Sequence, residues 1–348
     1  MKKTWLIALV ILALAGQGMM AAAGEATAPS KKAVKLIKKA EKAIKDKDFV
    51  KAGEFYQKVI ETEPDCAEAY FGMGRLQLAQ NQYEAGEKSL AKALELAPDH
   101  TGAAKLMARL YFSQAQQLQQ QRKVDEANQL YAKLIALPKI VEVDRPHLAQ
   151  SLYQLGVNLY TQKKFKESTE TLKKFQQVPM VQTEYAPLFP ASHYIIGLNL
   201  SQSKDFNSSN EYLAKYIEIR KDAKEDQLLP LAYFVLASNS FQGLDAEAAP
   251  IKADKKAKDR KEKLAELAAK YRKAIVPNLE KAIELKSDLE PAYVTLGNFY
   301  YYAKDLENTV STYEKMIALF PNSPDKSRYE SFLSDVKQEI ENRAKITK

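Results

Sequence analysis

The sequence predicts an all-α protein built from about seven helix–turn–helix units in a row and closed by one further helix at the C-terminal end. Three observations carry this prediction. Similar segments follow one another at a period near 34 residues, as the alignment of Pro64 with Pro98 shows. Small and large side chains return at matching places in these segments. The chain contains only 12 Gly and 14 Pro in 348 residues, so helices are rarely interrupted.

The composition excludes several classes of protein. Apolar residues make up 46% of the chain, which rules out collagen-like sequence and low-complexity disorder. Cys66 is the only cysteine, so a disulfide framework and a multi-cysteine zinc site are excluded. The histidines His100, His147 and His193 lie far apart in the sequence. No G-x-S-x-G, H-E-x-x-H, C-x-x-C or phosphate-binding glycine loop occurs, so we expect no cofactor, no metal and no catalytic site.

The N-terminal residues 1–23 have the pattern of a secretory signal peptide. Two lysines precede an apolar run from Trp5 to Ala15, and small residues end at Ala23. We expect cleavage after Ala23. Gln17 follows the LALAG stretch where a bacterial lipoprotein would carry cysteine, so we expect no lipidation.

The alternative is an uncleaved membrane anchor. The 19 residues from Trp5 to Ala23 would just cross a hydrocarbon layer of about 30 Å, but polar and flexible residues interrupt them. The predicted location is therefore periplasmic or secreted, in a bacterial envelope. Nucleic acid is not expected as a partner, although the net charge is +8.

The mature chain divides into a short linker, a run of repeats and a capping helix. The linker is 24–32, and the repeat region is 33–323. The predicted repeats are 33–66, 67–100, 101–144, 145–185, 186–226, 227–289 with a basic insertion at 250–274, and 290–323. Residues 324–348 form the capping helix, with Tyr329, Phe332, Leu333, Val336 and Ile340 on one face. Repeats three to six contain insertions and fit the period less well than the others.

The repeats share three positions with a physical meaning. A small residue in the first helix lets the second helix approach closely; it falls on Ala40, Gly74, Ala108, Gly156, Gly197, Ala237 and Gly297. A large residue of the second helix enters the core; it falls on Tyr56, Leu90, Tyr131, Leu172, Leu213, Leu279 and Tyr313. A second small site falls on Ala52, Gly86, Ala127, Ser168, Ser209 and Thr309, with Ile275 out of line.

This pattern resembles the tetratricopeptide repeat, with its period of 34 residues and its order of Leu-Gly, aromatic, Ala, aromatic and Pro. The resemblance covers nearly all of the mature chain. It implies a right-handed superhelical solenoid in which the first helix of each repeat lines a concave face, with no separate catalytic domain.

We expect the inner face to carry residues three before, one after and four after each first-helix small site. The candidate binding residues are Phe71, Arg75, Lys105, Arg109, Phe112, Tyr153, Tyr160, Tyr194, Phe234, Phe241, Asn298 and Tyr301. Aromatic and Arg side chains are frequent anchors of interfaces. The predicted ligand is a peptide or helix of another envelope protein, with an acidic or C-terminal carboxylate group. The alternative is that several of these aromatic residues only pack between repeats.

Positive charge is concentrated in two segments. Residues 252–273 hold ten Lys or Arg against four acids, and residues 31–51 hold nine Lys against three acids. The lysines of 31–51 are interpreted as a solvated outer face. The insertion is expected to be partly helical and to lie on its neighbours, and it is a candidate for peripheral contact with anionic phospholipid or an acidic protein.

The leading interpretation is a non-catalytic periplasmic or secreted scaffold that binds a partner protein on its concave face. One alternative is an envelope-assembly adaptor that keeps its N-terminal segment in the inner membrane. A less favoured alternative is a helical enzyme acting on the cell wall, which would need two carboxylates converging in one cleft. The oligomeric state stays open.

Overall fold

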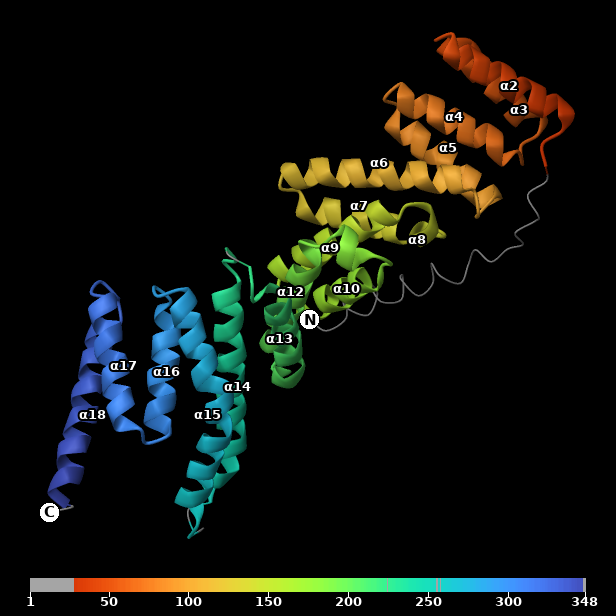
Figure 1. The fold of residues 1–348 in the computed structure, drawn as a ribbon. Helices are drawn as coiled ribbons and strands as arrows, with labels where there is room; N and C mark the ends of the chain where they lie inside the picture. The colour runs from red at the N-terminus through yellow and green to blue at the C-terminus, as the bar shows by residue number, and fades with distance from the viewer. Residues whose placement is uncertain (1–27, 224, 255, 257, 347–348) are drawn as a thin grey trace, which may run out of the picture. The chain divides into compact units, whose positions relative to one another are not determined.

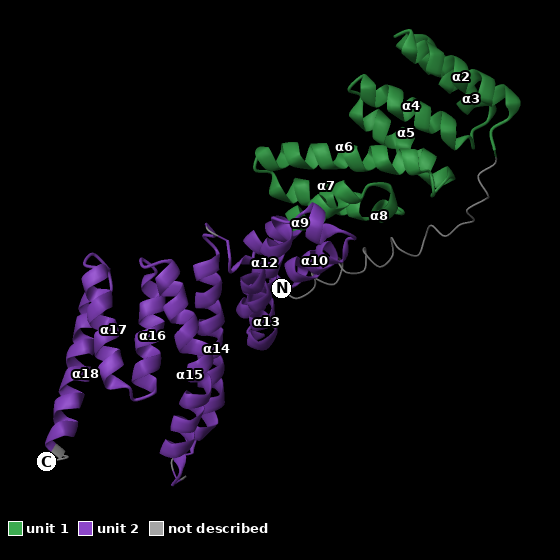
Figure 2. Cartoon of the chain, in the orientation of Figure 1, with its two compact units in different colours: residues 1–155 green, residues 156–348 purple. Residues whose placement is uncertain are grey.

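The computed structural model describes residues 28–223, 225–254, 256 and 258–346. The predicted signal peptide, residues 1–23, and residues 24–27 of the linker lie outside these residues. The chain forms two compact units that divide between Leu155 and Gly156 (Figure 2). The described residues form helices and turns and contain no strand, so the all-α prediction is confirmed.

Unit 1 consists of antiparallel helix pairs stacked side by side (Figure 1). The pairs are α2 (Lys31–Lys45) with α3 (Phe49–Thr62), α4 (Ala67–Ala79) with α5 (Tyr83–Leu96), and α6 (Thr101–Gln120) with α7 (Val124–Ile135). The one-turn helix α8 (Ile140–Val143) and the larger part of α9 (Arg145–Thr161) follow. The first helices of the pairs are neighbours, because α4 contacts both α2 and α6.

Unit 2 continues the same plan. It contains the end of α9, then α10 (Phe165–Gln177), α11 (Val181–Glu184), α12 (Leu188–Gln202), α13 (Phe206–Arg220), α14 (Leu229–Ala253), α15 (Arg260–Leu285), α16 (Glu290–Tyr302), α17 (Leu306–Leu319) and α18 (Lys326–Ile346). The pairs α12–α13, α14–α15 and α16–α17 pack in chain order, and α18 packs on α17. Hydrophobic clusters lie within and between these pairs.

Short turns join the two helices of most pairs. A residue in the left-handed region ends the first helix in six of the described pairs: Lys47, Asn81, Arg122, Lys163, Lys204 and Lys304, with φ of 60–62°. Several second helices then begin after an Asp whose carboxylate accepts a backbone N–H, as Asp205 does from Ser208 at 3.3 Å. The left-handed residue stops one helix and the capping Asp starts the next.

The small sites of the first helices are explained by direct packing. A Cβ added to Gly197 would lie 2.7 Å from Cγ of Leu213, and one added to Gly297 would lie 2.5 Å from Cε2 of Tyr313. These distances are well inside carbon–carbon contact. The large residue of each second helix therefore occupies the space that the missing side chain leaves, as the sequence pattern predicts.

The third pair departs from this register. In the first, second, fourth and fifth pairs the two small sites are 12 residues apart, but Ala108 and Ala127 are 19 apart. Counting back 12 residues from Ala127 gives Ala115, which is fully buried, as is Ala108. Tyr131 also donates a hydrogen bond to Gln119 at 2.8 Å, 12 residues earlier. The insertion lengthens α6 by about two turns, so both alanines stay on one face.

A buried polar ladder crosses the stack in unit 2. The Ser209 hydroxyl donates to the Gly197 carbonyl at 2.7 Å, and the Asn239 amide donates to the Ser209 hydroxyl at 2.8 Å. The same arrangement one repeat earlier joins the Asn199 amide to the Ser168 hydroxyl at 2.9 Å. All four side chains are buried. Because an unpaired buried polar group is costly, the ladder favours one register between neighbouring pairs.

The last helix caps the stack. In α18, Tyr329, Phe332 and Leu333 pack against the cluster around Tyr313, and Val336 is buried. The Phe332 ring lies 4.9 Å from the Tyr313 ring, centroid to centroid. The predicted apolar face of the capping helix thus covers the second helix of the final pair.

Candidate functional site

A shallow depression lies on unit 1 where α4 and α6 run side by side. Its volume is about 200 Å³, and its walls are Phe71, Arg75, Gly102, Lys105, Leu106 and Arg109. It brings together four of the twelve predicted binding residues: Phe71, Arg75, Lys105 and Arg109. Phe71 and Arg75 are one helical turn apart on α4, and Lys105 and Arg109 are one turn apart on α6, so both pairs face the same side.

The start of α6 holds Phe71 in place. The His100 ring lies 4.6 Å from the Phe71 ring, and its Nδ1 accepts the Ala103 backbone N–H at 3.1 Å, which caps the helix. A Cβ at Gly102 would lie 2.9 Å from Cζ of Phe71. The Phe71 ring, which forms the aromatic floor of the depression, is therefore held by the capping side chain of His100 and by the absence of a side chain on Gly102.

Three cations surround this aromatic floor. Arg75, Lys105 and Arg109 are exposed, and none of them forms an ion pair with a residue that the structure describes. The Arg75 guanidinium carbon lies 5.5 Å from the centroid of the Phe71 ring, within the range of a cation–π contact. The guanidinium and ammonium groups keep their donors free for an incoming carboxylate.

A second, apolar depression adjoins the first. It measures about 420 Å³ and is lined by Ile44, Phe49, Arg75, Leu76, Leu78, Ala79 and Leu106. Arg75 and Leu106 line both depressions, so the two are continuous. Our list of binding residues omits Ile44 and Phe49. Ile44 stands four residues after Ala40, so the spacing rule points to it, whereas Phe49 begins a second helix and carries no such signal.

Sequence profiles of the tetratricopeptide repeat match two regions of the chain, residues 43–116 and residues 292–323. The first region contains α4 and α5, and the second contains all of α17 and all but the first two residues of α16. The helix pairs seen there have the small-and-large packing of the predicted repeat. The chain contains tetratricopeptide repeats in both units.

Several solved structures are similar to this chain. The pilF protein of Pseudomonas aeruginosa is 18% identical over 76% of this chain and 96% of that one, with a TM-score of 0.39. The C-terminal part of a TPR repeat-containing protein from Cytophaga hutchinsonii is 14% identical over 84% of this chain and 98% of that one, with a TM-score of 0.39. YrrB, a TPR protein with an unusual peptide-binding site, is 18% identical over 55% of this chain and 88% of that one, with a TM-score of 0.30. No curated relative matches.

Two predicted binding residues of the tetratricopeptide repeats are buried. Phe112 is 7% exposed and packs edge-on against His147, ring to ring at 4.8 Å. Tyr194 is 8% exposed and lies 5.3 Å from the Tyr216 ring. Their placement on an open wall was wrong: the start of α9 folds over Phe112, and Tyr194 packs into the cluster formed by α13 and the start of α14.

Three more predicted residues, two half-buried aromatic residues and the exposed Asn298, contact other side chains of unit 2. The Tyr301 ring meets Phe332 of the capping helix at 5.1 Å. The Phe241 ring meets Phe299 edge-on at 5.9 Å, and the Asn298 side chain accepts a hydrogen bond from a core tyrosine at 2.8 Å. Tyr301 and Phe241 follow the alternative interpretation, in which aromatic residues join repeats to one another.

The remaining predicted residues lie outside the depression. Tyr153 in unit 1 is half-buried, and burial raises the pKa of its phenol. Tyr160 and Phe234 in unit 2 are half-buried as well; Tyr160 lies 6.2 Å from the Phe165 ring, and Phe234 packs on a hydrophobic cluster. The candidate site therefore consists of the four residues on α4 and α6 and the apolar depression beside them.

Cysteine and histidine are the side chains best suited to catalysis or metal binding, but Cys66 and His193 are both buried in structural positions. Cys66 is buried at the start of α4, and burial raises the pKa of its thiol, which disfavours the reactive thiolate. His193 is buried among aromatic rings, and burial lowers its pKa. Within the described residues, no group of three His, Cys, Asp or Glu side chains is arranged to hold a metal ion. No described helix is long and apolar enough to span a membrane.

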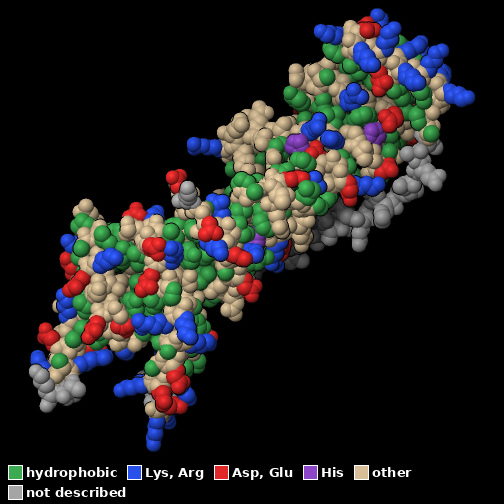
Figure 3. Space-filling view, in the orientation of Figure 1, with side chains coloured by type: hydrophobic (Ala, Val, Ile, Leu, Met, Phe, Trp, Pro, Cys, Tyr) green, Lys and Arg blue, Asp and Glu red, His purple; other side chains and the backbone are tan. Residues whose placement is uncertain are grey.

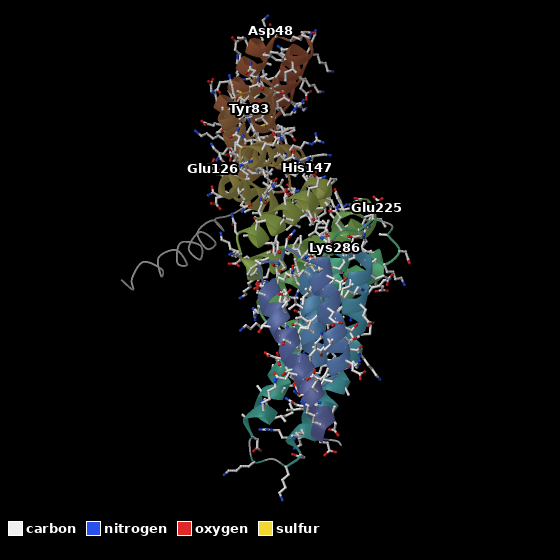
Figure 4. All side chains as sticks on the ribbon, turned by 90° about the vertical axis from the view of Figure 1, so that its left-hand side faces the viewer. Asp48, Tyr83, Glu126, His147, Glu225 and Lys286 are labelled. Atoms are coloured by element: carbon white, nitrogen blue, oxygen red, sulfur yellow. The ribbon has the colours of Figure 1, made fainter. Side chains whose placement is uncertain are left out.

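A cavity of about 750 Å³ beside the α13–α14 loop is lined by two acidic side chains, Glu225 and Asp226, and by Lys286 at the end of α15. Figure 4 labels Glu225 and Lys286. Burial disfavours ionisation of Asp226, but hydrogen bonds from Arg220 at 2.6 Å and Tyr216 at 2.7 Å outweigh it and lower its pKa. A general acid for glycan cleavage needs a raised pKa. Asp226 therefore suits a structural role in closing this loop.

Proposed function

We propose that this protein is a non-catalytic scaffold that binds a segment of a partner protein on the α4–α6 face of unit 1. Tetratricopeptide repeats in general are protein-interaction scaffolds, which supports the class of function. The observation that carries the proposal is the joining of a cationic depression to an apolar one through Arg75 and Leu106.

The geometry favours a segment with two kinds of side chain close together. An acidic side chain or a C-terminal carboxylate fits between Arg75, Lys105 and Arg109. A large apolar side chain one or two residues away fits the depression beside Phe49 and Leu78. Either an extended peptide or one face of a helix presents such a pair.

A display experiment tests this proposal with defined ligands. A library of random peptides is selected on the chain from residue 24 onward, and selected peptides are measured by fluorescence anisotropy. We expect sequences that combine an acid with a large apolar residue, and we expect Arg75→Glu/Arg109→Glu to abolish their binding. The control Lys35→Glu/Lys42→Glu changes two exposed residues of α2 by the same charge and should leave binding intact. The proposed site is contradicted if both variants lose peptide binding to the same extent, or if the selected peptides contain no acidic residue.

We further propose that the protein works in the periplasm or outside the cell after cleavage at Ala23, with another envelope protein as its partner. The sequence pattern of residues 1–23 supports this location. The alternative is an adaptor that keeps this segment in the inner membrane. Intact mass of the exported protein separates the two: a chain beginning at Gly24 supports cleavage, and a full-length membrane-bound chain supports the adaptor.

A further inference from the structure

The α14–α15 pair projects beyond the neighbouring α16–α17 pair of unit 2 (Figure 1). Its helices have 25 and 26 residues, whereas α16 and α17 have 13 and 14. At a rise of 1.5 Å per residue, the twelve additional residues in each helix extend the pair by about 18 Å. Figure 1 shows its lower end past the turn between α16 and α17. The basic insertion, 250–274, contributes the last four residues of α14 and the first part of α15 to this extension, so it is split between two paired helices instead of forming one helix that lies on its neighbours.

Specific contacts hold the extension together. The Glu247 carboxylate on α14 accepts hydrogen bonds from the Tyr271 hydroxyl at 2.7 Å and from Lys270 at 2.9 Å on α15. Ala248 and Ala268 are buried between the helices. Lys252 lies 4.6 Å above the Tyr302 ring and 3.1 Å from its neighbour Asp245. These contacts make the extension a built part of the unit as far as Lys252 on α14 and Lys270 on α15.

The end of this hairpin is strongly basic. Residues 252–263 contain seven Lys or Arg and three Asp or Glu, a net charge of +4. Lys256, Lys258 and Lys261 are exposed and form no ion pair with any described residue. Figure 3 shows Lys and Arg side chains along the projecting end. Exposed Lys304, in the α16–α17 turn, and exposed Lys345, near the end of α18, lie at the same end of unit 2.

The composition of the tip favours a lipid surface over a protein. Protein interfaces are rich in aromatic residues and Arg and poor in Lys. Residues 252–263 contain no aromatic residue, and six of their seven cations are lysines. The lysine ammonium is a compact charge that binds phosphate without fixed geometry. Because Lys256, Lys258 and Lys261 are all exposed, several lysines can meet a layer of phosphate headgroups at once.

We propose that the exposed lysines Lys256, Lys258 and Lys261, at the tip of this hairpin, form an electrostatic contact for an anionic phospholipid surface. A lysine near such a surface contributes about 1 kcal/mol, which is roughly a fivefold gain in binding. Replacing Lys256, Lys258 and Lys261 with alanine should therefore weaken the contact roughly a hundredfold. The interaction should also weaken with salt, because surface charges are screened beyond about 10 Å at 0.1 M ionic strength.

Vesicle co-sedimentation tests this inference on the chain from residue 24 onward. The probes are vesicles of phosphatidylcholine alone and vesicles with about 30 mol % phosphatidylglycerol, at low and high salt. We expect binding only to the anionic vesicles, with loss at high salt and in Lys256→Ala/Lys258→Ala/Lys261→Ala. The matched control, Lys35→Ala/Lys38→Ala/Lys42→Ala, removes the same charge from the other basic segment and should bind almost as well as the parent.

Three results would overturn the inference. The parent protein does not bind anionic vesicles at low salt, it binds both kinds of vesicle equally, or the control loses as much binding as the tip variant. Circular dichroism at 222 nm and the thermal unfolding curve show that each variant is folded. The substituted lysines are exposed and lie beyond the Tyr271–Glu247 contact, so we expect both measurements to match the parent.

Discussion

Replacing Gly197 with alanine tests the close packing that defines each helix pair. The new Cβ would lie 2.7 Å from Cγ and 2.8 Å from Cδ2 of the buried Leu213. Carbon atoms prefer a separation of about 3.5–4.0 Å, so the helices must move apart by almost 1 Å. Overpacking of this kind costs about 1–3 kcal/mol, and the better helix propensity of alanine returns about 1 kcal/mol. We expect a net destabilisation of up to about 2 kcal/mol.

Gly243→Ala is the matched control, because it lies in another first helix of the same unit. Its new Cβ would meet only Tyr271, with the nearest atom at 3.4 Å. Alanine there should stabilise the protein by up to about 1 kcal/mol, so the two variants should differ by about 1–3 kcal/mol. Urea unfolding followed at 222 nm measures the difference, fitted separately for each transition because repeat proteins can unfold in steps.

The double variant Gly197→Ala/Leu213→Ala gives an independent check on the same contact. Leu213→Ala alone leaves a cavity and should cost about 2–5 kcal/mol. In the double variant the clash is gone and the added methyl group fills part of the cavity, so its cost should be less than the sum of the two single costs. Equal stability of Gly197→Ala and Gly243→Ala, or strictly additive costs in the double variant, would refute the packing argument.

Three further substitutions test other features. Asp226→Asn should cost about 1–3 kcal/mol of unfolding free energy at neutral pH, because it weakens the charged hydrogen bond from Arg220. The folded-state pKa of Asp226 is lowered, so this stability is present above the ordinary pKa of aspartate and is lost as the pH falls. In urea unfolding, the difference between the variant and the parent should therefore vanish in acid. His100→Ala should cost about 1 kcal/mol through loss of the α6 cap, whereas His100→Asn keeps an acceptor and should unfold at nearly the parent temperature. Asn239→Ala leaves the Ser209 hydroxyl without its donor and should cost about 1–3 kcal/mol in urea unfolding; a stabilised variant would contradict the ladder.

The sequence was sufficient to predict the pairs because their packing depends on local spacing. Gly297 and Tyr313 are 16 residues apart, and this separation follows from one helix, a short turn and the start of another. The structure brings Tyr313 to within 2.5 Å of a Cβ on Gly297, as this geometry requires. The pairs with insertions fit less well because the period alone does not say which helix becomes longer.

The candidate site was predictable only in part. Helical spacing places Arg75 and Arg109 on one face, and the structure finds both beside one depression. The same rule selected Phe112 and Tyr301, which other segments cover: α9 over Phe112, and α18 over Tyr301. Which segment folds over a helix end depends on contacts between distant residues, and a single sequence with regular spacing does not contain that information.

The polar ladder also corresponds to a sequence pattern of its own, separate from the small and large positions. Asn158, Asn199 and Asn239 each follow a first-helix small site by two residues. Three buried asparagines at one repeat position are unusual because a buried amide needs partners. Serines at the second small site, Ser168 and Ser209, provide them for the latter two.

The location of the insertion has a consequence for how such a chain changes during evolution. New residues at the turn between α14 and α15 extend only that pair and leave the adjacent α16–α17 pair at its ordinary length. Duplication or deletion of whole helical turns there alters the reach of the hairpin without repacking the neighbouring repeats. A turn of this kind lets a lineage acquire or discard a peripheral surface while the ancestral architecture is inherited unchanged.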